Sequence, residues 1–302
     1  WNLVNQIARY HELWVLTQGQ HRESIEDFVR GSDAPIIHFM YLSLPRWLAP
    51  MLNYQGSHQF YYFLWQILAY FVAVKLHKKF NFSLFHHVTY ANDWMASYVG
   101  ALLPVPYVRG PGGGAHRTPR KFLNQYNLKG RIWEKTRSIG QFCFRKDPFF
   151  IVGQRRAKAI LLCNKEALDS LPKKWLHKAH LFAVCGVSSD DLGKTFENTS
   201  NNGVFKVLSA GKLLPIKGFE LTLRAFAIFV AQYPHAMLTI VGSGPELAHL
   251  QLLAQKLKVK DKVVFAGWKP REDLLSLMAE SDVFLFPSLR DGGGAVVVEA
   301  MS

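Results

Sequence analysis

The hydrophobic pattern in the second half of the chain predicts strands that alternate with helices. Residues 205–210 form a short apolar run typical of a buried strand. Beyond Gly218, apolar residues recur at helical spacing (Phe219, Leu223, Phe226 and Val230). The alternation continues with strands at 236–241, 262–266 and 283–287 and with helices from Pro245, over 271–281 and from Ala295. This succession predicts a parallel, doubly wound α/β sheet.

The first half of the chain shows the same alternation less regularly. Strands are predicted at 11–17, 35–42, 83–89, 106–109, 158–164 and 179–186, and helices at the chain start, at 23–30, from 92 or 93 to 103, within 119–157 and at 165–170. A chain of 302 residues is too long for most single cores. We therefore expect two Rossmann-like domains, over residues 1–187 and 204–302, joined by the polar stretch 188–203.

Residues 59–74 are almost wholly apolar and could be taken for a membrane span. The run is shorter than the roughly 20 residues needed to cross hydrocarbon, and Gln66 lies near its middle. Three basic residues (His77, Lys78 and Lys79) follow, as the dipole of a helix end favours. We interpret the stretch as a buried or partly interfacial helix.

Two short stretches of the second half carry groups suited to a diphosphate joined to a ribose. Residues 211–218 place Lys212 and Lys217 on a strand-to-helix turn, at the sheet edge where open α/β sheets bind ligands. Residues 291–299 place three glycines before a helix, where free N–H groups bind anions, with Glu299 about 6 Å into that helix. Each pattern alone is also typical of a solvated turn or a flexible loop. Both together, with a third turn at 241–246, favour a phosphate site.

These motifs resemble the nucleotide-sugar-binding domain of the family 4 glycosyltransferases, which are retaining enzymes of the GT-B fold. The likeness covers Val207 to Ser302 and includes a Val-Gly-x-Gly-Pro-Glu turn and two acidic residues eight positions apart. It implies that the two lysines hold the donor diphosphate, that Glu299 binds the ribose and that Asp291 contacts the transferred sugar. The family normally has Glu where Asp291 stands. The implied donor-binding residues are Lys212, Lys217, Gly211, Gly242, Gly244, Gly292, Gly293, Gly294 and Glu299.

The first half resembles a branch of the same family that has a His-His-Val-Thr strand and a Gly-Pro-x-Gly-Gly-Gly loop, here from His86 and from Gly110. Strand alternation puts His86 and His87 on opposite faces, so at most one points toward a shared pocket. A histidine at a strand end is also commonly a hydrogen-bonded core residue. The candidates are Asp291 and His87 as catalytic residues, and Arg109, Gly112, Gly113, Gly114 and His116 on the acceptor side.

Positive charge is concentrated in the first part of the chain. The net charge is +14; residues 1–200 carry 25 Lys and Arg against 13 Asp and Glu, and residues 201–302 carry 11 against 9. A basic face attracts polyanions without specifying which. Since no nucleic-acid module is recognised, we expect a lipid-linked acceptor or an anionic membrane surface rather than nucleic acid. A merely solvated surface is the alternative.

The cysteines and the chain ends bear on location. The three cysteines (Cys143, Cys163 and Cys185) lie in apolar contexts without metal-type spacing and indicate buried thiols in a reducing compartment. No signal peptide is recognised. We expect a cytoplasmic protein. A protein bound peripherally at the inner face of the plasma membrane is a variant of this expectation. The chain starts and stops within predicted helices, so we also expect a fragment truncated at both termini.

Together these features predict a hexosyl-type glycosyltransferase with two domains facing a cleft. It would move a sugar from a nucleoside diphosphate sugar to a glycan or lipid-linked acceptor, with retention, in polysaccharide biosynthesis. No metal or other cofactor is expected, because the lysine pair supplies the positive potential. Two alternatives stay open. A dinucleotide-dependent enzyme should show three fingerprint glycines, and residues 241–244 supply two. A non-catalytic polyanion-binding protein would need only the basic half.

Overall fold

The computed structural model describes residues 2–30, 37–53, 55–88, 94–113, 118–126, 128–184, 203–291 and 294–302. The chain divides into two compact units. The first holds Trp1–His87, Ala96–Val108 and Lys146–Lys158, and the second holds Val88–Met95, Arg109–Arg145 and Ala159–Ser302. The predicted connection at 188–203 lies, apart from Gly203, outside the described residues, so the predicted domain boundaries stay a prediction.

A four-stranded sheet forms the centre of the second unit. Its order is β10-β7-β8-β9, with β7 at Phe205–Ala210, β8 at Ala236–Val241, β9 at Val263–Gly267 and β10 at Val283–Phe284. Every neighbouring pair in this sheet runs parallel. The parallel sheet predicted from the apolar runs is therefore confirmed.

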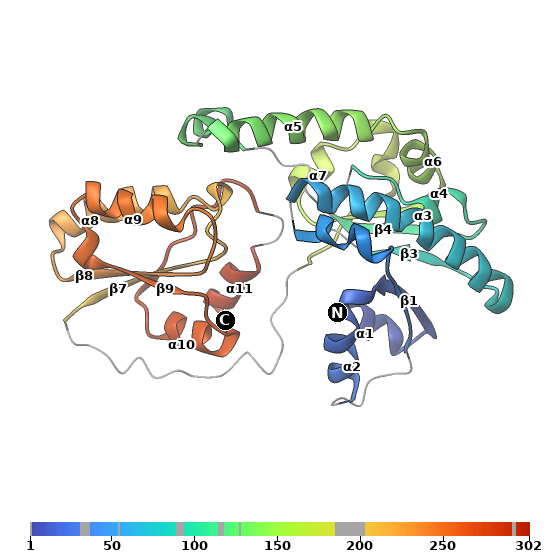
Figure 1. Ribbon diagram of the computed structural model, residues 1–302, viewed down its shortest axis with the longest axis horizontal. Helices are drawn as coiled ribbons and strands as arrows, with labels where there is room; N and C mark the ends of the chain where they lie inside the picture. The colour runs from blue at the N-terminus through green and yellow to red at the C-terminus, as the bar shows by residue number, and fades with distance from the viewer. Residues whose placement is uncertain are drawn as a thin grey trace. The chain divides into compact units, whose positions relative to one another are not determined.

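Helices cover both faces of this sheet. In Figure 1, α8 (Phe219–Gln232) and α9 (Leu247–Lys256) lie on one face, and α10 (Arg271–Ala279) and α11 (Ala295–Met301) lie on the other. Successive residues of β7 pack into two hydrophobic clusters, one on each face of the sheet. Val207 packs with α8 and α9, whereas Leu208 packs with α10 and α11. This is the two-residue period of a strand buried on both sides.

In the first unit, the strands β1 (Leu13–Gln18) and β2 (Ile37–Leu42) pair in parallel. The apolar stretch at 59–74 lies within the longer helix α3 (Gln55–Phe80). The buried side chains of α3 recur at about one-turn spacing and so share one face (Tyr61, Tyr62, Trp65, Gln66, Ala69 and Ala73). Among the described residues, no helix is both long enough and apolar enough to span a bilayer.

A second four-stranded sheet has the order β3-β4-β5-β6. Its strands are Phe85–His87, Tyr107–Gly112, Ala157–Leu162 and Ala179–Leu181. The remaining α-helices are α1 (Asn2–Ala8), α2 (Arg22–Arg30), α4 (Tyr98–Leu102), α5 (Leu128–Phe144), α6 (Pro148–Arg156) and α7 (Lys165–Asp169). Short 3-10 helices span Gly19–His21, Arg46–Asn53, Arg120–Gln125, Lys173–Lys178, Pro215–Lys217 and Lys260–Lys262.

Two predicted boundaries near β4 are wrong. The strand does not end at Arg109 but continues to Gly112, whose carbonyl accepts a hydrogen bond from the Cys163 N–H (3.0 Å). The helix expected from 92 or 93 to 103 is α4, which begins at Tyr98. It starts there because the Ser97 hydroxyl caps it by accepting from the Gly100 N–H (3.2 Å).

The burial predicted for the cysteines is also wrong where the structure describes them. Cys143 is exposed, because it lies beside Phe142 on the side of α5 that faces outward. Cys163 is half-buried, and Cys185 lies outside the described residues. An apolar sequence context therefore does not establish burial on this helix.

Candidate functional site

The turn that follows β7 is held against the end of β8. The Gly211 N–H donates to the Val241 carbonyl (2.9 Å). Gly242 has φ +140°, and a Cβ there would overlap the Gly211 carbonyl oxygen. A Cβ at Gly244 would likewise overlap the backbone of Leu213. The glycines predicted to bind the donor thus have a packing role, since they let the turns at 211–218 and 241–246 approach.

The loop between β10 and α11 lies directly against the turn at 211–218. The Leu289 N–H donates to the Ile216 carbonyl (2.9 Å), and the Ser288 hydroxyl reaches the same oxygen (3.3 Å). Gly218 has φ +73°, and a Cβ there would overlap the Pro287 carbonyl oxygen. Two segments about seventy residues apart in sequence are therefore joined through their backbones.

Lys217 and Asp291 form an ion pair where these two loops meet. The Lys217 ammonium donates to Asp291 Oδ2, and Asp291 Oδ1 accepts from the Gly294 N–H (2.8 Å). The ammonium also lies 5.4 Å from the ring centroid of Phe286. The side chains are 23% and 24% exposed, so the pair is partly desolvated but still open to a ligand. The other two glycines of this loop, Gly292 and Gly293, lie outside the described residues.

Glu299 and Lys212 occupy different surroundings. Glu299 lies on α11, and its Oε1 accepts from the Arg271 Nε–H of α10 (2.9 Å). Lys212 is exposed at the start of the turn at 211–218 (the first turn). The sequence did not indicate Arg271 as a partner, because its position after Pro270 predicts only a helix start. The structure thus gives the proposed ribose-binding carboxylate a cation that orients it.

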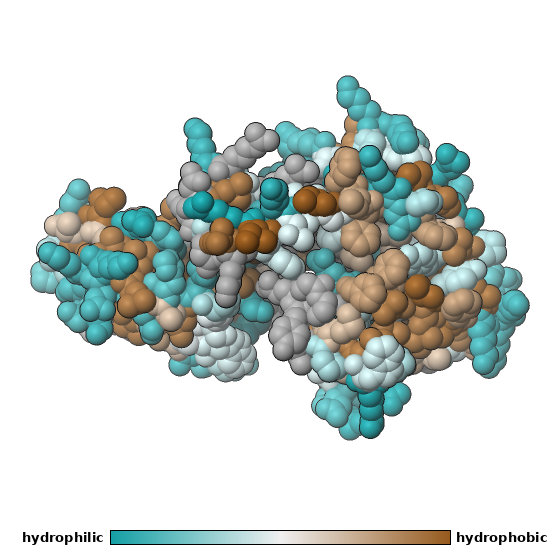
Figure 2. Space-filling view, turned by 45° about the horizontal axis from the view of Figure 1, so that its top comes forward, coloured by the Kyte–Doolittle hydropathy of each residue, from teal (hydrophilic) through white to brown (hydrophobic). Residues whose placement is uncertain are grey.

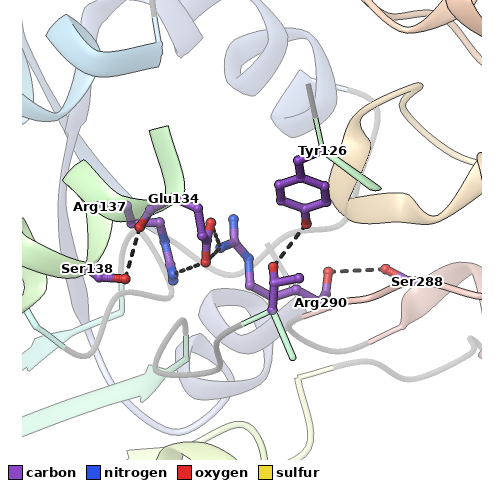
Figure 3. A network of polar contacts seen from close by, with 7 residues as sticks. Tyr126, Glu134, Arg137, Ser138, Ser288 and Arg290 are labelled. Atoms are coloured by element: carbon purple, nitrogen blue, oxygen red, sulfur yellow. Dashed lines mark hydrogen bonds and ion pairs between the residues drawn. The ribbon is translucent and has the colours of Figure 1, made fainter. Parts of the chain in front are cut away.

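Arg290, the residue before Asp291, is paired with Glu134 of α5 (Figure 3). One guanidinium nitrogen, Nη1, donates to both carboxylate oxygens of Glu134, at 2.8 and 2.7 Å. Arg137, one turn along α5, reaches the same carboxylate at 3.4 Å. The Glu134 and Arg290 side chains are only 8% and 12% exposed. Sequence reasoning missed this pair; the only signal is the position of Arg290 beside Asp291.

Tyr126 lies close to this ion pair in Figure 3. Its hydroxyl shares a hydrogen bond with the Thr118 hydroxyl (3.0 Å). Burial, first of all, raises the pKa of Tyr126, and the Glu134 carboxylate adds to the rise; the bond to Thr118 and the cations Arg290 and Arg137 act the other way. Tyr126 also lines a small cavity with Pro215 and Gly218. Tyr126, which precedes α5 in the chain, therefore borders the turn at 211–218.

The candidates from the first half lie in well-packed positions. His87 Nε2 lies 2.9 Å from the Tyr62 hydroxyl and 3.2 Å from Gln66 Nε2, both on α3. These contacts agree with the alternative that a histidine at a strand end is a hydrogen-bonded core residue. Arg109 is buried in β4, and Gly113 follows that strand. Two further acceptor-side candidates, Gly114 and His116, lie outside the described residues.

A metal site was not predicted from the sequence. In the described parts of the chain, no three His, Cys, Asp or Glu side chains are grouped so that they could hold a metal ion. The charged side chains at the two loops include Lys212, the pair of Lys217 with Asp291, and Arg290, which is paired with Glu134 of α5.

Residues 190–302 match the protein family described as "Glycosyl transferases group 1". Among curated relatives, the uncharacterized glycosyltransferase YqgM of Bacillus subtilis (strain 168) is 32% identical over 145 residues, which are 48% of this chain and 40% of that protein. The chain spans about half the length or less of the first curated relatives it matches.

Solved structures share the fold at low sequence identity. WaaG, a glycosyltransferase involved in lipopolysaccharide biosynthesis, aligns with a TM-score of 0.53 at 15% identity, over 96% of this chain and 77% of its own. HepE of Anabaena, in complex with UDP and glucose, aligns with a TM-score of 0.50 at 15% identity, over 97% and 78%. Residues 190–302 are thus similar to the group 1 glycosyl transferases, and the chain has the α/β fold of the GT-B glycosyltransferases.

Proposed function

We propose that this chain is part of a glycosyltransferase that moves a sugar from a nucleoside diphosphate sugar to a glycan or lipid-linked acceptor. The observation that carries the proposal is the ion pair between Lys217 and Asp291, at the carboxyl ends of β7 and β10. Ligands of open α/β sheets bind at this edge. The match of residues 190–302 to a glycosyltransferase family supports the same conclusion.

In this proposal, the lysines stabilise the leaving diphosphate. Negative charge builds up on the diphosphate as its bond to the sugar breaks, and fixed cations lower the energy of that state. Lys217 is held in place by Asp291 before the donor arrives, so little reorganisation is needed. Lys212, which is exposed at the same turn, adds a second cation. Two ammonium groups can supply the charge that a divalent metal supplies elsewhere, so we expect activity to persist in EDTA.

The two carboxylates have separate roles in the proposal. Glu299 binds the ribose, because Arg271 occupies one of its oxygens and orients the other for a hydroxyl donor. Asp291 contacts the transferred sugar, with its carboxylate fixed by Lys217 and by the Gly294 N–H. Retention of configuration and transfer of a hexose are further parts of the proposal, and they rest on the family resemblance. HepE, whose solved structure holds UDP and glucose, makes a uridine nucleotide the first donor to test.

The surface of α5 favours a lipid-linked acceptor at an anionic membrane. Five large apolar residues of this helix are exposed (Leu128, Ile132, Trp133, Ile139 and Phe142), while the polar Glu134 and Gln141 are buried. Basic residues stand among them, and Arg131 and Lys135 are exposed. Figure 2, in which the part of Figure 1 that holds α5 comes forward, shows hydrophobic side chains at the surface beside hydrophilic ones. Apolar insertion together with basic charge is how interfacial helices bind anionic bilayers.

Thermal-shift screening of the full-length protein tests the donor assignment. The set is UDP-, GDP- and ADP-sugars, with NAD as the control for the dinucleotide alternative. We expect a rise of several degrees with one nucleotide sugar and none with NAD, because a ligand that binds only the folded state stabilises it. Substitution of Lys212 and Lys217 by alanine should abolish the shift. A shift with NAD alone, or binding of polyanions that is indifferent to both lysines, would favour the alternatives.

Vesicle flotation tests the membrane contact. The wild-type protein should float with vesicles of phosphatidylglycerol and phosphatidylcholine but not with phosphatidylcholine alone, since the basic charge requires an anionic surface. Replacement of Ile132 and Phe142 by serine should abolish flotation. The matched control replaces Phe60 and Phe71, which are exposed on α3, by serine. Equal loss in both double variants would contradict a specific role for α5.

A further inference from the structure

The ion pair between Glu134 and Arg290 joins parts of the chain that are 156 residues apart. Both members are almost fully covered, and Arg290 Nη1 lies within 2.8 Å of each carboxylate oxygen. Hydrogen bonds between two charged groups are among the strongest in proteins. A buried ion pair contributes little net stability compared with apolar packing, so its presence calls for another explanation.

Arg290 is fixed by its backbone as well as by its side chain. Its carbonyl accepts from the Ser288 hydroxyl (3.1 Å), and the Leu289 N–H is bound to the Ile216 carbonyl of the first turn (2.9 Å). The chain from 288 to 290 is thus attached to the first turn on one side and to α5 on the other (Figure 3). The next residue along the chain is Asp291.

The orientation of Asp291 follows from this attachment. Its two carboxylate oxygens bind the Lys217 ammonium and the Gly294 N–H, which are the groups proposed to contact the donor. A change in the Arg290 backbone would rotate Asp291 and release the ammonium from its position. Arg290 itself is buried, and its charge is already paired with that of Glu134 on α5.

We infer that Glu134 is a positioning residue, which holds Arg290 and thereby sets the places of Asp291 and Lys217 for a nucleoside diphosphate. This inference rests on the proposed function. It assigns a role in donor binding to a helix that none of the donor motifs includes. Tyr126, whose pKa the Glu134 carboxylate helps to raise, also borders the first turn beside Pro215 and Gly218.

The test is the affinity of the full-length protein for UDP and GDP, measured by titration calorimetry well below the melting temperature. We expect Glu134→Gln to weaken binding of the nucleotide that the wild type prefers by roughly tenfold or more, since a small misplacement of binding groups is costly. The matched control is Glu26→Gln, which removes exposed ion pairs with Arg22 and Arg30 and should leave the affinity unchanged.

A double-mutant cycle separates positioning from general stability. In a Lys217→Ala background, Glu134→Gln should change the affinity by less than about twofold, because the group that it positions is already absent. If Glu134→Gln folds poorly, the double variant Glu134→Gln with Arg290→Gln removes both members of the pair together, so that Arg290 is not left as an unpaired buried charge; this variant should fold while still binding weakly. Variants that melt earlier but bind as tightly as the wild type would overturn the inference alone. A wild type that binds no nucleoside diphosphate would reject the proposed function and this inference with it.

Discussion

Lys217 and Asp291, which are 74 positions apart, share an ion pair where two loops of one parallel sheet meet. The contact depends on the backbone around it, because Leu289 is bound to Ile216 and Gly218 lies against Pro287. A pair that is only partly exposed keeps its geometry without a ligand, and its ammonium can still be reached. This combination suits a group that must meet negative charge in a fixed place.

Lys217→Ala should weaken nucleoside diphosphate binding roughly 10- to 100-fold, because a hydrogen bond to a charged group is worth about 1.5–3 kcal/mol. The free energy of unfolding should fall by less than ~1 kcal/mol, since ion pairs near the surface contribute little. Calorimetric titration and denaturant unfolding measure the two quantities. Lys256→Ala, which removes an exposed lysine of α9, is the control. Equal affinities for both variants would contradict the assignment.

Gly218→Ala should destabilise the protein more than Gly267→Ala. Both glycines have φ near +70°, which costs an L-residue about 1–3 kcal/mol. Only at Gly218 would the added Cβ also overlap a carbonyl oxygen, that of Pro287, whereas Gly267 has open space. We expect both variants to lower the melting temperature, and only Gly218→Ala to weaken nucleotide binding as well. If both variants lose binding equally, the contact at Pro287 does not shape the site.

Glu246→Gln should raise the melting temperature at neutral pH. Burial raises the pKa of Glu246 above its ordinary value of 4.5, Glu220 adds to the rise, and His249 lowers it. An acid with a raised pKa in the folded state contributes stability below its unfolded pKa, and this contribution is lost as the pH rises through the folded pKa. Glutamine stays neutral, so the variant should melt at a higher temperature than the wild type once the pH exceeds the folded-state pKa of Glu246. This difference should vanish below pH 4.5. An advantage that is the same at every pH would show another cause.

The sequence predicted the sheet of β7 to β10 well because its central strands are buried on both faces. β7 and β8 have the predicted bounds, since a strand covered on both sides is a continuous apolar run that ends at a glycine. The meeting of Lys217 with the Asp291 loop followed from the rule that parallel strands end at one edge. β10 was predicted longer than it is, because its apolar run continues into the loop that carries Phe286.

Contacts between distant segments could not be predicted in the same way. Glu134 lies on a helix that exposes large apolar residues as well as basic ones, so the usual amphipathic pattern gives no sign that Glu134 is buried. Its partner, Arg290, belongs to a loop that has no periodicity. The bond between Glu299 and Arg271 likewise joins two helices, α11 and α10, that are separated in the sequence by strand β10. The sheet to which β10 belongs determines how these two helices pack. Such pairs depend on tertiary structure, which local patterns do not contain.

Glu299→Gln should separate ribose binding from diphosphate binding. If Glu299 accepts hydrogen bonds from the ribose, the variant should bind UDP or GDP roughly 10-fold more weakly, because a charged acceptor is worth about 1.5–3 kcal/mol. Its affinity for inorganic pyrophosphate, which has no ribose, should not change. Lys217→Ala should instead weaken both ligands. Arg271→Ala should resemble Glu299→Gln with a smaller effect, because it only releases the carboxylate. Glu280→Gln, an exposed carboxylate just beyond α10, is the control. Weaker pyrophosphate binding by Glu299→Gln would show that this carboxylate acts on the whole site, and the ribose assignment would then be wrong.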